Sequence, residues 1–432
     1  MKKANLLLTG VLSLSMLAIG CSSRTDSAAQ SGDQLVIEWM AHPAYSMQSS
    51  DPKRVEYLKN ASAEFEKTHA NAQLKPTVLS SNINEAMAKL LEQADQGRAP
   101  DVAQIDSYIF PRYYSYLQPL DSYLEKAGIK LDDFFPFAQQ IMKGPDGKIY
   151  GLQFTTDARV LYYRKDLVPA PPKTWADVLS IGKDLKAKGY DPLLVPGGRG
   201  EGAAVTSLWP FFWSQGGKLV DDTDKPVFGE GENREKMLNV LKAYQEGVAS
   251  GVIPKRSANY GSESDLNPEI ATGKVAMFLG GNWQAKQLQS IIDEKQLANW
   301  AVAPMPEMPG GKHVTTAGGW TWGIFTKDPA KQQAAFDFLI QTFVGDKGMT
   351  NWTNIGGYLP VRKSVYDLTD YQKDGFTNTF KEHLDKYAQM RPAAPAYQEV
   401  STQLQIAASS VIAGSKTPEQ ALDDAWTSVG RK

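Results

Sequence analysis

Aromatic and polar side chains follow two predicted strands at the points where those strands end. Trp283 follows a Gly-Gly turn that ends at Asn282, and Asp106 and Ser107 directly follow another strand. Ligands of open α/β sheets bind beyond the carboxyl ends of the strands. An indole face fits the apolar face of a sugar ring, while carboxylate and amide groups bind its hydroxyls. These residues therefore predict a sugar site, with core packing as the alternative for any single tryptophan.

Other candidate ligand contacts lie in loops or beside strands. His42 comes just past the first predicted strand, Asp157 lies between two strands, and Trp320 follows a Gly-Gly pair. Trp209 and Trp213 are four residues apart and therefore share one face of a predicted helix. Two alternatives stay open, because a lone histidine is more often an ordinary polar residue and an aspartate in a turn often caps the backbone.

Few residues in the chain could perform catalysis or hold a metal. Cys21 is the only cysteine, which excludes an intrachain disulfide and a cysteine metal site. The histidines have no metal-ligand spacing, and no phosphate-binding loop, dinucleotide fingerprint or Gly-x-Ser-x-Gly elbow is present. Asp106 and Asp157 could form the carboxylate pair of a glycosidase, but the sequence gives no separation between them. We therefore predict neither a cofactor nor a metal ion.

The N-terminal residues have the pattern of an export signal. A short basic segment precedes an apolar stretch from Leu6 to Ile19, and small residues lead from there to Cys21. The pattern resembles the lipobox of bacterial lipoproteins, in which the cysteine is acylated and becomes the mature N-terminus. We expect a signal peptide over residues 1–20 and a lipidated, flexible leash over residues 21–34.

Composition predicts an exported globular protein rather than a nucleic-acid binder. The 432 residues are 42% hydrophobic and 22% charged, and the net charge is −2. No basic patch stands out, so a nucleic-acid partner is not expected. No segment after Cys21 has enough apolar residues to span a bilayer, so anchoring would rest on the lipid. The length is sufficient for two lobes.

Predicted strands alternate with amphipathic helices along the chain. The first strands are 35–40, 73–78 and 100–105, a βαβαβ order that indicates a mostly parallel sheet with helices on both faces. Later strands are expected at 148–155, 159–164, 273–279, 300–303 and 319–326. Helices are expected after Thr174, over 330–344 and after Thr417.

Nine short motifs, taken together in order and spacing, resemble one protein family. They are GRAPDV (97–102), DGKIYG (146–151), LYYRKDL (161–167), PKTWAD (172–177), GKVAMF (273–278), GNW (281–283), AGGWTW (317–322), YLPVR (358–362) and TPEQAL (417–422). The chain is similar to the extracellular solute-binding proteins of bacterial ABC importers, in the group that includes maltose-binding protein and other sugar binders.

The resemblance implies an α/β fold of two lobes, each a largely parallel sheet flanked by helices, joined by a hinge with several crossings. Crossings would lie at residues 155–159, 314–319 and 358–362. The first lobe would comprise residues 35–155 and a return segment, 318–358. The second lobe would comprise residues 156–317 and the C-terminal helices of residues 359–432.

The resemblance also implies which residues contact a ligand held between the lobes. Positions that match ligand contacts of sugar-binding members are His42, Asp106, Ser107, Asp157 and Trp283. The matched motifs add Asn282, Gly319, Trp320 and Arg362. Tyr397 is the aromatic residue nearest to Ser401, where some relatives have a tryptophan.

The resulting interpretation is a lipid-anchored, monomeric receptor that performs no chemistry. It would capture a carbohydrate, which we expect to be an oligosaccharide, and deliver it to an ABC permease at the outer face of a bacterial membrane. The alternatives are a lipid-anchored glycoside-cleaving enzyme and a binding protein for another polar solute, such as a polyamine or chelated iron. The near-neutral charge and the tryptophans at strand ends favour a sugar over a polycation.

Overall fold

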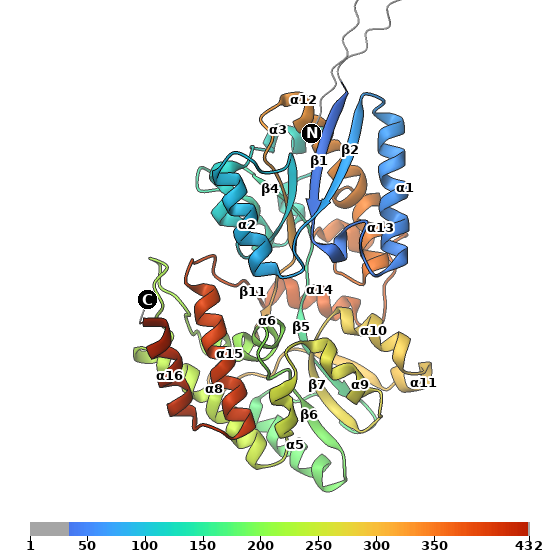
Figure 1. Ribbon diagram of the computed structural model, residues 1–432. Coiled ribbons are helices and arrows are strands. Elements are labelled where there is room, and N and C mark those ends of the chain that lie inside the picture. The colour runs from blue at the N-terminus through green and yellow to red at the C-terminus, as the bar shows by residue number, and fades with distance from the viewer. Residues whose placement is uncertain (1–33, 431–432) are drawn as a thin grey trace, which may run out of the picture.

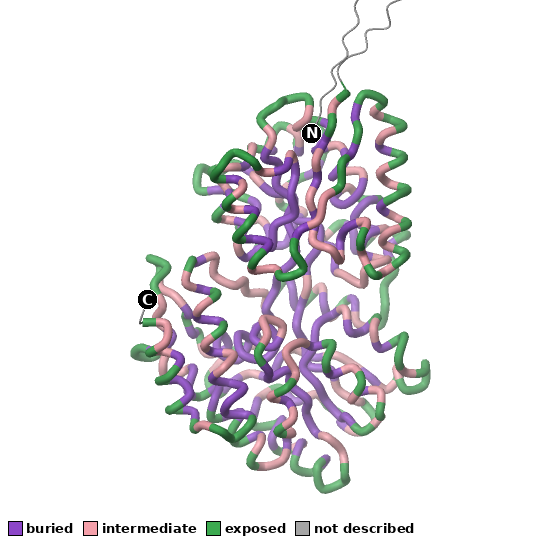
Figure 2. Tube along the Cα trace, viewed as in Figure 1, coloured by how far each residue is buried: buried purple, intermediate pink, exposed green. Residues whose placement is uncertain are grey.

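The computed structural model describes residues 34–430, which form two β-sheets surrounded by helices and joined by chain crossings (Figure 1). The predicted signal peptide, Cys21 and nearly all of the leash lie outside the described residues. Both sheets are buried along most of their length, whereas the outer faces of the helices are exposed (Figure 2). The two-lobed α/β fold expected from the sequence is therefore confirmed.

The first sheet has five strands in the order β2-β1-β3-β10-β4. Their bounds are β1 Leu35–Ala41, β2 Ala72–Val78, β3 Val102–Asp106, β4 Gly151–Thr155 and β10 Trp320–Ile324. β1 pairs in parallel with β2 and β3, while β10 lies antiparallel between β3 and β4. The sheet is thus parallel except for β10, the strand that returns from the second lobe.

The second sheet repeats this design with four strands in the order β6-β7-β5-β8. Their bounds are β5 Arg159–Arg164, β6 Asp191–Leu194, β7 Val275–Gly281 and β8 Trp300–Ala303. β6 and β7 are parallel, and β5 runs antiparallel to both of its neighbours. In each lobe, the first strand after a crossing is the antiparallel one.

Helices of the first lobe cover its sheet where the sequence provides caps. They are α1 Pro52–Thr68, α2 Ile83–Asp95, α3 Asp121–Lys126, α4 Pro136–Met142, α12 Pro329–Leu339 and α13 Asp346–Gly356. The side chains of Asp51 and Asn82 accept N-terminal amides of α1 and α2. The helix predicted over 330–344 is found in two parts. Its first part is α12, and a π-helical turn, Ile340–Val344, continues α12 to the predicted end.

Helices of the second lobe include the C-terminal pair. They are α5 Trp175–Ala187, α6 Glu201–Ala203, α7 Trp209–Ser214, α8 Gly231–Ala249, α9 Asn267–Ile270, α10 Trp283–Ile291, α11 Glu294–Leu297, α14 Thr377–Lys386, α15 Tyr397–Ala413 and α16 Pro418–Gly430. Thr174 and Asp177 form the predicted capping box of α5. A π-helical turn, residues 204–208, joins α6 to α7.

Aromatic side chains dominate the core of the first lobe. Trp39 and Trp322 are fully buried with ring centroids 6.0 Å apart, and Trp322 packs at 5.5 Å from Phe154. Phe343 lies 5.0 Å from Trp322 and 5.3 Å from Trp352. Burial of each such side chain stabilises the fold by roughly 1.5–3 kcal/mol. This packing fixes the sheet whose edge carries several of the candidate site residues.

The crossings are held by backbone pairing. Thr156 and Leu359 exchange both backbone hydrogen bonds, and the short strands β9 (Thr315–Thr316) and β11 (Ala388–Gln389) pair in parallel. Beyond Leu359, the chain keeps contacting the first lobe, because Val361 O accepts the backbone N–H of Phe135. These contacts favour a last lobe boundary later than the expected residue 359.

Candidate ligand-binding site

Three of the predicted residues meet at one edge of the first sheet. His42 follows β1, Asp106 ends β3, and Trp320 pairs directly with Asp106 at the start of β10. The rings of His42 and Trp320 are 5.3 Å apart. Burial lowers the pKa of His42, so its imidazole is neutral at pH 7. The edge lies on the side of the sheet that faces the second lobe (Figure 1).

Asp157 and Trp283 meet at the first crossing through an arginine. The Arg159 guanidinium donates a hydrogen bond to the Asp157 carboxylate and lies over the Trp283 ring, 5.1 Å from its centroid. Arg159 Nε is also 3.7 Å from a carboxylate oxygen of Glu263. Burial raises the pKa of Glu263, and the charge of Arg159 opposes that rise. Arg159 thus links an acidic hinge residue to the predicted stacking ring.

A cavity of about 590 Å³ opens beside Asp157 and Trp283. The residues that line it are Tyr45, Asp51, Arg54, Asp157, Trp283, Lys286, Gln287, Ser290, Ile355, Gly356 and Tyr358. They come from both lobes and from the first crossing, and the volume lies within the range of small-molecule sites, roughly 300–1,000 Å³. We define this volume as the Trp283 cavity and take it as the candidate site.

The lining of the Trp283 cavity combines apolar ring faces with donors and acceptors. Tyr45 and Tyr358 stack with centroids 5.1 Å apart and planes 24° apart. Arg54 lies 5.0 Å from the Tyr358 ring centroid, and its guanidinium donates to the carbonyls of Ala44 and Gly356. These bonds hold the guanidinium in place. Such a surface can bind a polyhydroxylated ligand through ring contacts and charged hydrogen-bond partners.

Polar side chains fill the opposite side of the crossing. The Arg391 guanidinium donates to Asp106 Oδ1 at 3.0 Å and to Glu201 Oε1 at 3.3 Å, and it lies 4.2 Å from the Tyr108 ring centroid. The side chains of Arg391 and Asp106 are 10% and 6% exposed. Burial raises the pKa of Asp106, while the charge of Arg391 opposes that rise. Asp106 is therefore held in an ion pair.

Glu201 gathers further donors from α15. It accepts hydrogen bonds from the hydroxyls of Tyr397 and Ser401 and from Gln405 Nε2. The indole N–H of Trp209 donates to the Tyr397 hydroxyl at 2.9 Å. We call Asp106, Arg391, Glu201 and these α15 side chains the Arg391 network. Tyr397, a predicted ligand contact, thus has its hydroxyl engaged within the protein.

The two tryptophans predicted on one helix face pack in the core of the second lobe. Trp209 and Trp213 stack with centroids 6.2 Å apart and are 0% and 3% exposed. Neither lines the Trp283 cavity. The alternative of core packing therefore describes them better than ligand contact, because the apolar face of α7 is covered by its own lobe.

Two other predicted residues hold the crossings together. Asn282 Oδ1 accepts the backbone N–H of Ala158, and its Nδ2 donates to Gly357 O. Gly319 has φ +121°, and a Cβ there would lie 2.0 Å from Thr155 O, so no larger residue fits. Both residues position the crossing segments, and this structural role differs from the ligand contact suggested by the sequence.

Arg362 and Ser107 also differ from expectation. Arg362 pairs with Asp133 and Asp346, both at 2.8 Å, within the first lobe and away from the Trp283 cavity. Its charge is satisfied by these carboxylates, and it does not line the Trp283 cavity. Ser107 is fully buried, and its backbone N–H donates to Gly319 O. The Ser107 hydroxyl lacks a hydrogen-bond partner among the described residues.

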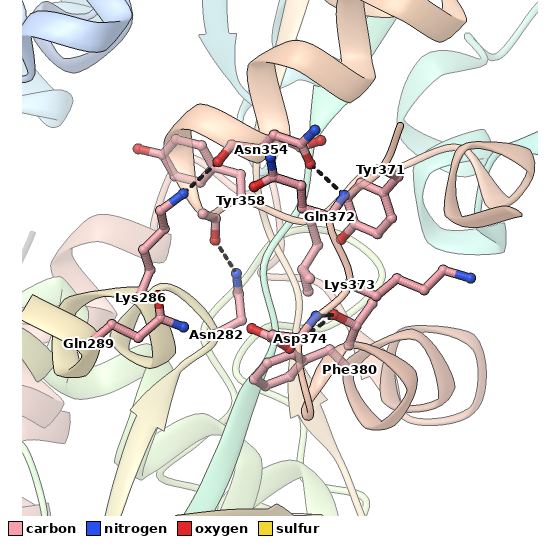
Figure 3. Close-up of a pocket in the computed structure, with 14 residues that line it drawn as sticks. Asn282, Lys286, Gln289, Asn354, Tyr358, Tyr371, Gln372, Lys373, Asp374 and Phe380 are labelled. Carbon is pink, nitrogen blue, oxygen red and sulfur yellow. Dashed lines mark hydrogen bonds between the residues drawn. The ribbon is translucent and has the colours of Figure 1, made fainter. Parts of the chain in front are cut away.

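A smaller cavity of about 220 Å³ lies behind the first crossing (Figure 3). Amide side chains and Lys286 line much of it, and Lys286 and Tyr358 also line the Trp283 cavity. Lys286 Nζ donates to Asn354 O at 2.5 Å, so α10 of the second lobe contacts α13 of the first. Most polar groups that line the smaller cavity already bond within the protein. We therefore assign the ligand to the Trp283 cavity.

Several site residues were missed by the sequence analysis. Tyr358 begins the motif YLPVR, but Arg362 at its other end was chosen instead. Tyr45 lies three residues beyond His42, close enough to have been considered. Arg391 and Glu201 had no comparable signal, since neither lies in a recognised motif.

Within residues 34–430 no three His, Cys, Asp or Glu side chains are grouped so that they could hold a metal ion. No helix within the same range combines the length and apolar character needed to cross a membrane.

Similar sequences include transport proteins from several bacteria. A maltooligosaccharide ABC transporter solute-binding lipoprotein of Streptococcus pneumoniae is 27% identical over 360 residues, which cover 79% of this chain and 77% of the relative. The maltodextrin-binding protein MdxE of Bacillus subtilis is 24% identical over 432 residues, covering 96% and 94%.

Solved structures share the fold. The sugar-binding protein MalE from Xanthomonas citri superposes with a TM-score of 0.73 at 22% identity, over 92% of this chain and 96% of that chain. The GacH receptor of Streptomyces glaucescens gives a TM-score of 0.71 at 21% identity, over 92% and 97%. A family model for bacterial extracellular solute-binding proteins matches residues 60–378, well over half of the chain. This chain belongs to the family of bacterial extracellular solute-binding proteins.

Proposed function

We propose that the protein is the carbohydrate-binding component of an ABC importer. The observation that carries this proposal is the Trp283 cavity, which is lined by the aromatic side chains of Trp283, Tyr45 and Tyr358 together with Asp157 and Arg54. Ring faces take up the apolar side of a sugar, and the charged groups take up its hydroxyls. The relatives named for maltooligosaccharides and maltodextrin support an oligosaccharide of glucose as the ligand.

The two lobes would close around the ligand by hinge bending. Few residues at the crossings absorb the backbone change in such closures. Thr156 and Leu359 at one crossing and β9 with β11 at another are the candidate hinge segments. In the closed form both lobes would present one surface to a membrane permease. We place the lobe boundaries as expected from the sequence, with the last one moved beyond Val361.

The anchor is the second part of the proposal. Cys21 follows the apolar signal segment, and the Streptococcus relative is named as a lipoprotein. Acylation of Cys21 would hold the monomeric receptor at the outer face of the bacterial membrane. Cys21→Ser should release the protein from the membrane while leaving its fold intact. Fatty-acid labelling of the variant as strong as that of the wild type would contradict this prediction.

A receptor is favoured over an enzyme by the state of the carboxylates. Asp106 is bound to Arg391, and Asp157 is bound to Arg159, so neither is poised as a free acid or base. The charged residues that line the Trp283 cavity are mixed in sign, with Asp51 and Asp157 beside Arg54 and Lys286, and this does not favour a polyamine. The family, too, consists of solute-binding proteins.

A thermal-shift screen of the full chain in detergent tests the proposed function. A mono- and oligosaccharide panel would be compared with polyamines and chelated iron. A ligand at about 100 times its Kd adds about 2.7 kcal/mol to the free energy of unfolding, which raises Tm measurably. The saccharide that raises Tm should be recovered unaltered after prolonged incubation. Cleavage products, or a shift with polyamines alone, would overturn the proposal.

A further inference from the structure

Arg391 links the two lobes through hydrogen bonds to a carboxylate of each. Its guanidinium bonds to Asp106 at the end of β3 in the first lobe and to Glu201 in α6 of the second. It also lies on the face of the Tyr108 ring. A single buried side chain thus spans the gap between the lobes.

The guanidinium lies just beyond the Trp283 cavity. A Cβ placed on Gly318 would be 3.2 Å from Asp157 Oδ1 and 3.7 Å from Arg391 Nη2, so the two charged groups flank the same backbone position. Asp157 lines the cavity, whereas Arg391, Asp106 and Glu201 do not. Figure 1 shows α15 and α10 on opposite sides of the crossing, with Tyr397 beginning α15 and Trp283 beginning α10.

The acceptors on the α15 side are already engaged. Glu201 receives hydrogen bonds from Arg391, Tyr397, Ser401 and Gln405. Asp106 receives one from Arg391 and one from the backbone N–H of Tyr108. A sugar on this side would have to displace Arg391 from two carboxylates, and separating a buried ion pair is costly.

We infer that Arg391 is a specificity-determining residue that closes the cleft on the α15 side and thereby limits the length of the bound saccharide. The inference rests on the proposed function and specifies it further. The ligand occupies the volume beside Trp283, and a sugar unit that extends past Asp157 meets the guanidinium. Loss of the guanidinium would turn Asp106 and Glu201 into acceptors for additional sugar hydroxyls.

The experiment compares affinity with chain length by titration calorimetry on the full chain in detergent. The probes are α-1,4-linked glucose oligomers of two to seven units, with a β-1,4-linked mannose series in parallel. In the wild type, affinity should stop rising once the Trp283 cavity is filled. In Arg391→Ala, the ratio of the affinity for the longest oligomer to that for the shortest should increase about tenfold, the effect of one added charge-assisted hydrogen bond.

Two further variants keep the test decisive. Arg391→Lys retains the positive charge but lacks the planar fork that reaches both carboxylates, so it should fold and change the ratio in the same direction. Arg362→Ala is the matched control, because Arg362 is a buried arginine between two carboxylates that does not line the cavity. It should lower stability and leave the ratio unchanged.

The outcomes separate the inference from the proposed function. If the wild type binds a series and neither Arg391 variant changes its length profile, the inference is overturned and the proposed function stands. If the wild type binds no saccharide of either series or of the screening panel, the proposed function fails and the inference fails with it. A change of ratio in Arg362→Ala equal to that in the Arg391 variants would also overturn the inference.

Discussion

The two sides of the crossing use similar residue types for different purposes. Trp283 lines the Trp283 cavity together with Asp157, and Arg159 lies over its ring. Trp209 lies beneath the Arg391 network and is fully buried, with its indole N–H bound to Tyr397. Trp283 borders a cavity between the lobes, whereas Trp209 is enclosed by its own lobe, so nearness to the crossing does not by itself decide the role of a tryptophan.

Trp209 lies on the α15 side of the crossing, where protein groups fill the space around it. Trp209→Ala should lower the free energy of unfolding by about 3–5 kcal/mol, because it removes a fully buried ring and leaves a cavity. Chemical denaturation without ligand measures this change. A loss below about 1 kcal/mol would show that Trp209 is not a core residue.

Replacing Trp283, which lines the cavity, should affect ligand binding more than stability. Trp283→Ala should weaken saccharide binding by roughly 2 kcal/mol, about thirtyfold, through lost ring contact and burial. Its Tm without ligand should fall much less than that of Trp209→Ala. Calorimetry together with thermal unfolding measures both quantities. Unchanged affinity with a large drop in Tm would assign Trp283 to the core.

His383 is a buried histidine that belongs neither to the Trp283 cavity nor to the Arg391 network, and it makes the stability of the protein depend on pH. Burial lowers the pKa of His383 to about 4; the nearby charge of Glu382 opposes this and that of His313 adds to it. The unfolded chain therefore binds a proton first, from about pH 6.5 downwards, and the folded state loses stability as the pH falls towards 4. About 2 kcal/mol should be lost between pH 7 and 5.

Replacing the histidine isolates its contribution. His383→Gln should flatten the slope of unfolding free energy against pH between 6.5 and 4, whatever its effect on absolute stability. Denaturation curves at a series of pH values give that slope. A slope equal to that of the wild type would assign the acid sensitivity to other groups.

Asp157 lies between the two sides of the crossing, because it lines the Trp283 cavity and flanks Gly318 together with Arg391. Asp157→Asn should weaken saccharide binding by about 1.5 kcal/mol, because an amide oxygen accepts hydrogen bonds from hydroxyls less strongly than a carboxylate. Arg159 would also lose its ion pair with Asp157, keep only that with Glu263, and hold the Trp283 ring less firmly. Wild-type affinity for the same saccharide would remove Asp157 from the site.

Much of the fold followed from local patterns in the sequence. The strand at Arg159–Arg164 and the capped helix after Thr174 have the predicted bounds, because alternation, caps and glycines act over a few residues. The antiparallel placement of β10 between β3 and β4 was not predicted. Strand order depends on pairing between segments far apart in the chain, which periodicity does not encode.

The candidate site was only partly predictable for a related reason. His42, Asp157 and Trp283 stand next to strand ends, and the structure places Asp157 and Trp283 at one cavity and His42 against Trp320. The partner of Asp106 is Arg391, which is 285 residues away and lies in no motif. Whether an acidic residue faces a ligand or an internal cation is decided by such distant partners, so the sequence predicted position better than role.

The insertion of β10 into the first sheet has a consequence for biogenesis. β3 and β4 have no pairing partner between them until Trp320–Ile324 has been synthesised, by which time the strands of the second sheet have already emerged. Pairing over so long a stretch of chain is slow to form. We expect nascent chains to remain unfolded long enough to be threaded through an export channel. A chain truncated after Val314 should accordingly leave its N-terminal segment open to protease, whereas one that continues past Phe343 should protect it.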